Sequence, residues 1–124
     1  TLTQYDHLVE DILSFFSERC NQARDCGVMD IIVDPGFGFA KTVEQNFELM
    51  RELHRFNVLN RAVLVGISRK SMIYKSLNTD ASGALNGTTA LHMIALQKGA
   101  HILRVHDVQP ALECIALHQR LQIS

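Results

Sequence analysis

Three short polar clusters hold most of the residues in this sequence whose types suit binding or catalysis. They contain two aspartates, five basic side chains, two serines and two glycines, in residues 34–41, 68–71 and 104–107. Carboxylates of this kind accept hydrogen bonds from a heterocycle, and clustered basic groups hold a carboxylate or phosphate by charge-assisted hydrogen bonds. The three clusters would suit a polar, anionic substrate if the fold brings them together.

Each cluster follows a short apolar run that is rich in β-branched residues, which is typical of a strand buried on both faces. The runs are residues 30–34, 62–66 and 101–105. Helical patterns alternate with these runs, and this alternation predicts a parallel sheet. All strands of a parallel sheet end at one edge, where α/β proteins bind ligands. We therefore expect the clusters to converge at that edge.

Apolar residues at helical spacing predict helices on either side of the expected strands. The predicted helices cover residues 3–25, 42–56, 84–98 and 110–121. Thr42 and Gln45 have the spacing of a capping box, and Pro110 suits the first turn of the last helix. Residues 67–82 are less regular, although a helical turn could begin near Ser71.

The predicted order, α-βα-βα-βα, lacks a strand before its first helix. Either the chain is a small open α/β sheet, or it contains the last βα units of a barrel. A (β/α)₈ barrel, the TIM barrel, needs about 250 residues. We favour the second interpretation: about three parallel strands and four helices of such a barrel, with residues 1–124 forming the C-terminal portion of one domain. Its N-terminal strands would be absent from this chain.

The composition argues against several classes of protein. The net charge is −1, so nothing indicates a nucleic-acid or membrane-surface partner. No apolar run approaches the ~20 residues that span a bilayer. The three cysteines form no CxxC pair, which makes a cysteine metal site improbable and favours a reducing, cytoplasmic location.

Each cluster has a chemical and a structural interpretation. Asp34 could accept paired N–H bonds from an aminopyrimidinone, or it could simply cap the glycine-containing turn that follows. The segment 68–71 suits a carboxylate or phosphate, or it is a solvated basic loop. Arg104 and His106 lie on one face of a strand and could hold an anion, unless Arg104 pairs structurally with Asp107.

The three clusters, in this order, resemble the motifs of dihydropteroate synthase. The matching segments are Asp-Pro-Gly-Phe-Gly-Phe-Ala-Lys, Gly-Ile-Ser-Arg-Lys-Ser and Gly-Ala-His-Ile-Leu-Arg-Val-His-Asp, at residues 34–41, 66–71 and 99–107. The resemblance covers the C-terminal part of that enzyme. It implies a homodimeric (β/α)₈ barrel of folate biosynthesis. This barrel condenses p-aminobenzoate with 6-hydroxymethyl-7,8-dihydropterin pyrophosphate, giving 7,8-dihydropteroate and pyrophosphate with Mg²⁺.

The resemblance also implies a role for individual residues. Lys70, Arg104 and His106 would be catalytic, with Lys70 touching the pterin oxygen and the last two holding pyrophosphate. The remaining substrate-binding residues would be Asp34 for the pterin ring, Phe39 and Ser71 for the ring and carboxylate of p-aminobenzoate, and Gly66 beside them. No metal ligand is expected in this part of the barrel, so the Mg²⁺ ligand would lie upstream.

The sequence departs from the family at some points. Ala40 replaces a frequent glycine, and residues 81–85 lack a Glu-Arg pair that many members carry. The metal-binding Asn and the mobile N-terminal loops have no counterpart, so we expect the fragment alone to be inactive. One alternative is a pterin-binding methyltransferase domain, which would have no pyrophosphate to hold. The other is a non-catalytic α/β fragment that associates with another chain.

Overall fold

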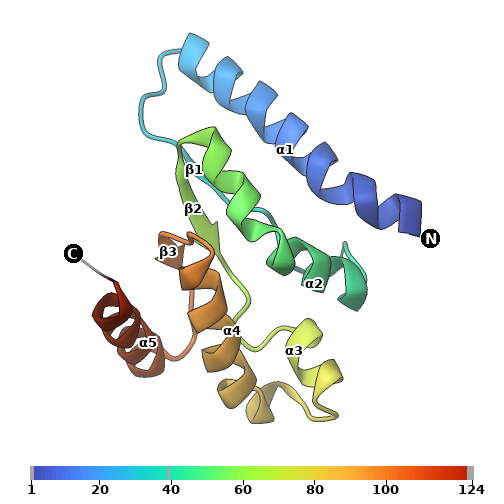
Figure 1. Cartoon of the computed structure of the whole chain (residues 1–124), viewed down its shortest axis with the longest axis vertical. Helices are drawn as coiled ribbons and strands as arrows, with labels where there is room; N and C mark the ends of the chain where they lie inside the picture. The colour runs from blue at the N-terminus through green and yellow to red at the C-terminus, as the bar shows by residue number, and fades with distance from the viewer. Residues whose placement is uncertain (1, 39, 123–124) are drawn as a thin grey trace.

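The computed structural model describes residues 2–38 and 40–122, and in them helices and strands alternate as the sequence predicts (Figure 1). In these residues two short 3₁₀ helices, η1 and η2, lie among the α-helices and strands. In chain order the elements are α1 (Leu2–Asp25), β1 (Ile32–Val33), α2 (Val43–Arg51), η1 (Leu53–Leu59), β2 (Ala62–Val65), α3 (Ser71–Ser76), η2 (Ala81–Gly83), α4 (Leu85–Gln97), β3 (Ile102–Leu103) and α5 (Val108–Leu121).

The strands in the described residues form a parallel sheet in the order β1-β2-β3. Ile32 is in register with Ala62, and Leu64 is in register with Ile102. The carboxyl ends of the three strands therefore lie on one edge, and the predicted convergence of the polar clusters is confirmed. This edge is where the chain leaves each strand for a loop that leads into a helix.

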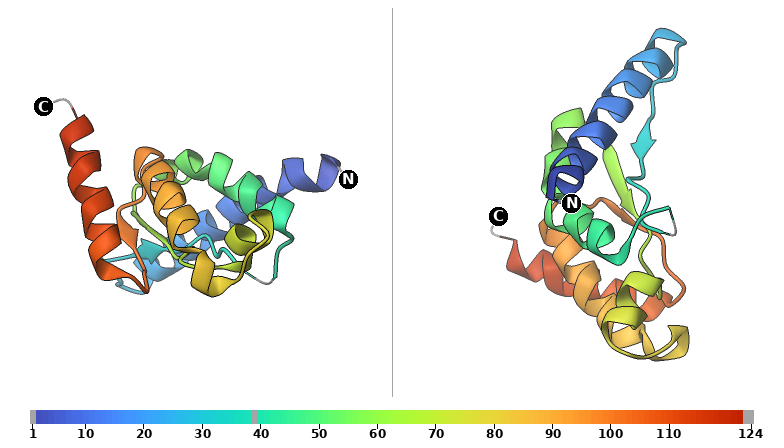
Figure 2. Two further views of the ribbon diagram at one scale, coloured as in Figure 1. Left: turned by 90° about the horizontal axis from the view of Figure 1, so that it is seen from below. Right: turned by 90° about the vertical axis from the view of Figure 1, so that its right-hand side faces the viewer.

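The prediction that the strands are buried on both faces is wrong. Val33, Val63 and Val65 are fully buried, whereas Ile32 is 57% exposed and Ile102 is 36% exposed. The helices lie along one side of the sheet and leave the other side open, as the right-hand view of Figure 2 shows. The alternating burial follows from this arrangement because successive side chains of a strand point to opposite faces.

The predicted helix 42–56 is two elements in the structure. The capping box of Thr42 and Gln45 is present, so the start of α2 is as predicted. The α-helix ends at Arg51, and η1 continues the chain with 3₁₀ geometry. Leu53 and Phe56 are fully buried and three residues apart, which matches the three residues per turn of a 3₁₀ helix. Burying both side chains favours the tighter helix here.

The described part of the chain has five α-helices rather than about four, because the turn expected near Ser71 forms the short helix α3. The predicted strands 30–34, 62–66 and 101–105 are longer than β1, β2 and β3, and α5 begins at Val108, which places Pro110 in its first turn. The core lies between the sheet and the helices and includes Val9, Leu49 and Phe56. No helix in residues 2–38 and 40–122 has the length and apolar character needed to cross a membrane.

Candidate functional site

An ion pair connects the two outer strands at the carboxyl edge of the sheet. Arg104 follows β3, and its Nη1 donates to Asp34 Oδ2, which follows β1, at 3.0 Å. The guanidinium reaches Asp34 by crossing Gly66, which follows the central strand β2. A Cβ on Gly66 would lie 2.3 Å from Arg104 Nη2, so only glycine leaves room for this crossing.

The interpretation of Arg104 as the structural partner of Asp107 is wrong. Asp107 pairs with Arg69 instead, through Arg69 Nε at 2.8 Å. Arg104 lies just beyond β3, and its side chain is 57% exposed. Arg104 therefore faces the open side of the site, with Asp34 as its partner.

Two lysines extend this positive region. Lys70 donates from Nζ to the carbonyl oxygen of Phe37, and Lys41 donates to the carbonyl of Gly36 at 2.5 Å. Burial lowers the pKa of Lys70, and the nearby Arg104 lowers this pKa further. Burial also lowers the pKa of Lys41. Both ammonium groups thus lose part of their hydration, which strengthens their attraction for a bound anion.

The loop that follows Asp34 is held by a residue that sequence reasoning missed. The side chain of Asn46, on α2, is buried and bonds both backbone groups of Gly38, donating to its oxygen and accepting from its N–H, each at 3.1 Å. Gly36 has a φ of +83°, a conformation that favours glycine. Asp34 Oδ1 accepts from the Gly36 N–H at 3.0 Å, so the capping role weighed for Asp34 is present as well.

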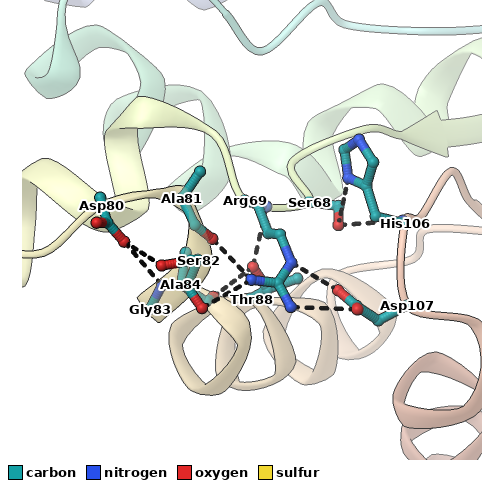
Figure 3. Close-up of polar contacts among 10 residues, drawn as sticks. All are labelled: Ser68, Arg69, Asp80, Ala81, Ser82, Gly83, Ala84, Thr88, His106 and Asp107. Atoms are coloured by element: carbon teal, nitrogen blue, oxygen red, sulfur yellow. Dashed lines mark hydrogen bonds and ion pairs between the residues drawn. The ribbon is translucent and has the colours of Figure 1, made fainter.

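His106 is oriented by Ser68, which is buried. Ser68 Oγ accepts from the His106 backbone N–H at 3.2 Å and lies 3.0 Å from its Nδ1 (Figure 3). Ser68 thus links the loop after β2 to the loop after β3. Its role was not evident in the sequence, because a serine in a basic segment is ordinarily a surface residue.

Two adjoining cavities open at this edge. The larger, of about 530 Å³, is lined by Phe37, Lys70, Ser71, Tyr74 and residues near them. The smaller, of about 110 Å³, is lined by Gly66, Ser68, Lys70, Arg104, Val105 and His106. Lys70 and Ser68 border both cavities, so the two form one continuous site with a basic inner part.

The structure thus brings together most of the residues predicted from the sequence. The larger cavity has Ser71 on its wall, the smaller has Gly66, Arg104 and His106, and Lys70 lies between them, while Asp34 is tied to Arg104. Phe39, another residue predicted for the site, lies outside the described residues. Beyond the predicted set, Tyr74 contributes an aromatic ring to the larger cavity.

No metal site is evident in the described part of the chain. Residues 2–38 and 40–122 contain no group of three or more histidine, cysteine or acidic side chains that could hold a metal ion. Asp34 and Asp107, the carboxylates at the edge, are each engaged by an arginine. The described residues therefore offer no evident set of ligands for a magnesium ion.

A set of parallel βα units whose charged groups gather at the carboxyl edge is the arrangement of a ligand-binding barrel. Comparison with known proteins identifies the family to which this barrel belongs. Residues 1–106 match the sequence model of a family described as pterin binding enzyme, and the chain belongs to this family.

Similar proteins include a dihydropteroate synthase of Clostridium beijerinckii, 48% identical over 109 residues, which are 86% of this chain and 40% of that protein. The chain therefore spans less than half of this relative. A dihydropteroate synthase from Thermus thermophilus, solved in complex with 6HMPPP, superposes with a TM-score of 0.87 at 35% identity, covering 93% of this chain and 47% of its own.

A third similar protein is a dihydropteroate synthase from Coxiella burnetii, solved in complex with pteroic acid. The two structures superpose with a TM-score of 0.89 at 33% identity, and the match covers 93% of this chain and 44% of the Coxiella burnetii chain. These superpositions confirm the predicted fold, in which the chain forms part of a (β/α)₈ barrel.

Proposed function

We propose that this chain is the C-terminal part of a dihydropteroate synthase. The reaction joins p-aminobenzoate to a dihydropterin pyrophosphate and releases pyrophosphate. One observation carries the proposal: a carboxylate and a basic cavity meet at the same strand edge, joined by the pair of Asp34 and Arg104. The relatives that bind the pterin pyrophosphate and pteroic acid support it. A pterin-binding methyltransferase has no pyrophosphate to bind, so the basic cavity argues against that alternative.

The pair of Asp34 and Arg104 satisfies two groups that the substrate would use. The amino and ring N–H groups of a pterin would replace the guanidinium as donors to Asp34. The pyrophosphate would replace the carboxylate as the acceptor for Arg104. In this proposal the substrate exchanges one set of charge-assisted hydrogen bonds for another, so neither group is left unpaired in the free or the bound state.

The basic residues of the smaller cavity would act on the leaving group. Arg104 and His106 would hold the pyrophosphate as negative charge builds on it, which is electrostatic stabilisation of a departing group. Lys70, between the cavities, would contact the pterin oxygen and flank p-aminobenzoate. Ser71, at the start of α3, would bind the carboxylate of p-aminobenzoate, and Phe39 would pack against its ring. No nucleophilic side chain is required, because the arylamine itself attacks the pterin methylene carbon.

The Mg²⁺ expected from the family belongs to the same proposal. When bound, it would neutralise charge on the pyrophosphate, and its ligand would lie in the upstream part of the barrel. Two further points also rest on the family resemblance: a cytoplasmic location and a single domain that contains residues 1–124.

We also propose that the protein is a homodimer. Four apolar side chains of α5 are more than half exposed: Val108, Leu112, Leu117 and Leu121. At 3.6 residues per turn, Val108 and Leu112 lie on one side of the helix and Leu117 and Leu121 on another, and exposed apolar pairs of this kind support contact with a second protein surface. Analytical ultracentrifugation of a completed barrel, in which this chain is joined to the upstream strands of a relative, would show a dimer. A monomer at micromolar concentration would contradict this part of the proposal.

The 124-residue chain alone is proposed to be inactive. The open face of the sheet carries the exposed Ile32 and Ile102, which the other strands of a barrel would cover. Activity is therefore to be tested in a completed barrel. In it, this chain replaces the matching residues of the Clostridium beijerinckii relative and is joined to that protein's upstream strands. The unaltered relative is the positive control for folding and activity.

Calorimetric titration of the completed barrel with the pterin pyrophosphate tests the proposed roles of the ion pair. We expect Asp34→Asn and Arg104→Met each to weaken binding at least ~10-fold, since each removes a charge-assisted contact. Asp30→Asn and Arg120→Met, at exposed positions away from the site, are the matched controls. Unchanged affinity in both site variants of a folded barrel would contradict the proposal.

A further inference from the structure

The guanidinium of Arg69 joins segments that are far apart in the sequence (Figure 3). Its Nε and Nη2 donate to the carboxylate of Asp107 at 2.8 and 3.2 Å. Its Nη1 donates to the carbonyl oxygens of Ala81 and Ser82 at 2.7 and 3.0 Å. The backbone N–H of Arg69 donates to Thr88 Oγ1, on α4, at 3.0 Å. These contacts among five residues are called the Arg69 bridge below.

Arg69 borders the larger cavity, yet its donors are committed to the protein. A guanidinium has five N–H donors, and the bridge uses four of them. The side chains of Arg69 and Asp107 are only 22% and 28% exposed. The hydrogen bond between them lowers the pKa of Asp107 and raises the pKa of Arg69. Arg69 is therefore suited to holding loops in place rather than to binding a substrate anion.

Asp107 stands at the N-terminus of α5, but its side chain does not cap that helix. It is the N-cap residue of α5, where an aspartate side chain ordinarily accepts from a free backbone N–H of the first turn. Its side chain makes no such bond, and both carboxylate oxygens accept from Arg69 instead. The helix forgoes a stabilising cap, so the contact with Arg69 determines where this loop lies.

The backbone of Arg69 adds a second constraint. Its φ is +54°, a left-handed conformation that is uncommon for a residue with a side chain. The residues on either side of it serve the site: Ser68 contacts His106, and Lys70 donates to the carbonyl of Phe37. The turn at Arg69 thus sets the directions of both neighbours, and the bridge holds that turn in place.

We propose that Arg69 is a positioning residue, which holds the loop after β2 and the loop after β3 in one fixed geometry. This inference rests on the proposed function, because it assigns Arg69 to two substrate sites at once. On one side of it lie Lys70 and Ser71, proposed for p-aminobenzoate. On the other side lies His106, proposed for pyrophosphate. Loss of the bridge should therefore impair the use of both substrates, although Arg69 touches neither.

Steady-state kinetics of the completed barrel at 25 °C test this coupling. We expect Arg69→Met to raise KM at least ~5-fold for both substrates and to lower kcat at least ~10-fold, since a small misplacement of reacting groups costs much rate. Asp107→Asn should give the same pattern. The double variant should be no worse than Arg69→Met alone, because both changes remove one shared contact. Arg69→Lys keeps the positive charge but lacks the planar guanidinium that donates two hydrogen bonds to Asp107. It should therefore recover part of the activity.

Two reference variants separate positioning from other effects. Ser71→Ala should raise KM for p-aminobenzoate alone, because its proposed contact is with that substrate. Arg55→Met removes an arginine paired with Glu10 at 4.0 Å on the helical side and should leave all constants within ~2-fold. If Arg69→Met changes the KM of only one substrate, or if its effects and those of Asp107→Asn simply add, the coupling is wrong.

Amide hydrogen exchange provides a readout that does not depend on activity. Asp107→Asn should speed exchange at the N–H of Arg69 and of His106 at least ~10-fold, since the first donates to Thr88 Oγ1 on α4 and the second to Ser68 Oγ in the loop after β2, and both contacts depend on where the two loops lie. Amides of β2 serve as the internal reference for folding. Unchanged exchange at both sites would overturn the coupling whatever the activity. An unsubstituted barrel without turnover would overturn the proposed function instead, and the exchange rates would then decide the coupling alone.

Discussion

Arg104 reaches Asp34 across the strand that separates them, and Gly66 is the residue that makes the crossing possible. The two partners are 70 residues apart in the sequence, and their side chains lie 3.0 Å apart over the middle of the sheet edge. Because the central strand contributes no side chain there, a carboxylate and a guanidinium from the outer strands form one surface. The proposed pterin and pyrophosphate sites are therefore contiguous.

Gly66→Ala should separate the pair without unfolding the protein. The new Cβ would lie 2.3 Å from Arg104 Nη2 and 2.7 Å from Cζ, so the guanidinium must move. The moving atoms end a flexible, half-exposed side chain, so we expect the free energy of unfolding to fall by less than ~1 kcal/mol. Turnover by the completed barrel should fall about 10- to 100-fold.

Gly27→Ala is the control for Gly66→Ala, because it adds a Cβ before β1, at the opposite edge of the sheet, where no atom lies within 4 Å, and its φ of +92° makes the change cost stability without touching the site. It should leave turnover within ~3-fold. Equal activity in the Gly66 variant and the control would show that the placement of Arg104 over Gly66 is not needed.

Asn46 should be required for the shape of the loop after Asp34. Asn46→Ala leaves the N–H and the carbonyl of Gly38 without their partner, and a buried unsatisfied group costs about 1–3 kcal/mol. Urea denaturation should show a loss of that size. Asn46→Asp keeps the acceptor but sets a buried carboxylate oxygen against the Gly38 carbonyl, so its loss should be at least as large. Asn86→Ala, at an exposed position on α4, should change stability by less than ~0.5 kcal/mol.

The ion pair of Arg69 and Asp107 should make stability depend on pH on the acid side. The pKa of Asp107 in the folded protein is below its ordinary value of 3.8, chiefly because Arg69 donates a hydrogen bond to it. A lowered carboxyl pKa contributes stability that is fully present above the unfolded value and is lost as pH falls through the folded value.

Thermal unfolding at pH values from 7 down to 3 measures this effect. The difference in Tm between the unsubstituted protein and Asp107→Asn should be constant above about pH 5 and should shrink as the pH falls below 3.8. Glu113→Gln, at an exposed position on α5, should show no such trend. A difference in Tm that stays constant over the whole range would rule out the contribution of this ion pair.

Local patterns in the sequence predicted the elements and the edge at which the site lies. The capping box of Thr42 and Gln45 shows why, because its two residues are three positions apart and their contact follows from helix geometry alone. The order of parallel βα units likewise places Asp34, Lys70 and Arg104 on one edge without further information.

The pairing of side chains could not be predicted in the same way. Whether Arg104 pairs with the nearby Asp107 or the distant Asp34 depends on strand order and on the gap at Gly66, and neither is encoded locally. The role of Asn46 depends on a loop that folds back on α2. The exposure of Ile32 was also missed, because an apolar run does not reveal whether both faces of its sheet are covered.

Residues 81–85 lack the Glu-Arg pair expected from the family resemblance, and in the structure the segment is held from two sides. Asp80 Oδ1 accepts from Ser82 Oγ at 2.6 Å and from the Gly83 N–H at 3.1 Å, and Arg69 binds the carbonyls of Ala81 and Ser82. The segment therefore keeps a defined position before α4 without that ion pair.

Release of pyrophosphate by the completed barrel tests the proposed reaction most directly. With the pterin pyrophosphate and Mg²⁺ present, release should depend on p-aminobenzoate. It should fall at least ~100-fold in Lys70→Ala, a loss of about 2.7 kcal/mol of transition-state stabilisation. Lys75→Ala, which removes an exposed lysine from the last turn of α3, the helix that follows Lys70, should leave the rate within ~2-fold. A folded barrel that releases no pyrophosphate, or one in which the two lysine variants behave alike, would contradict the assignment.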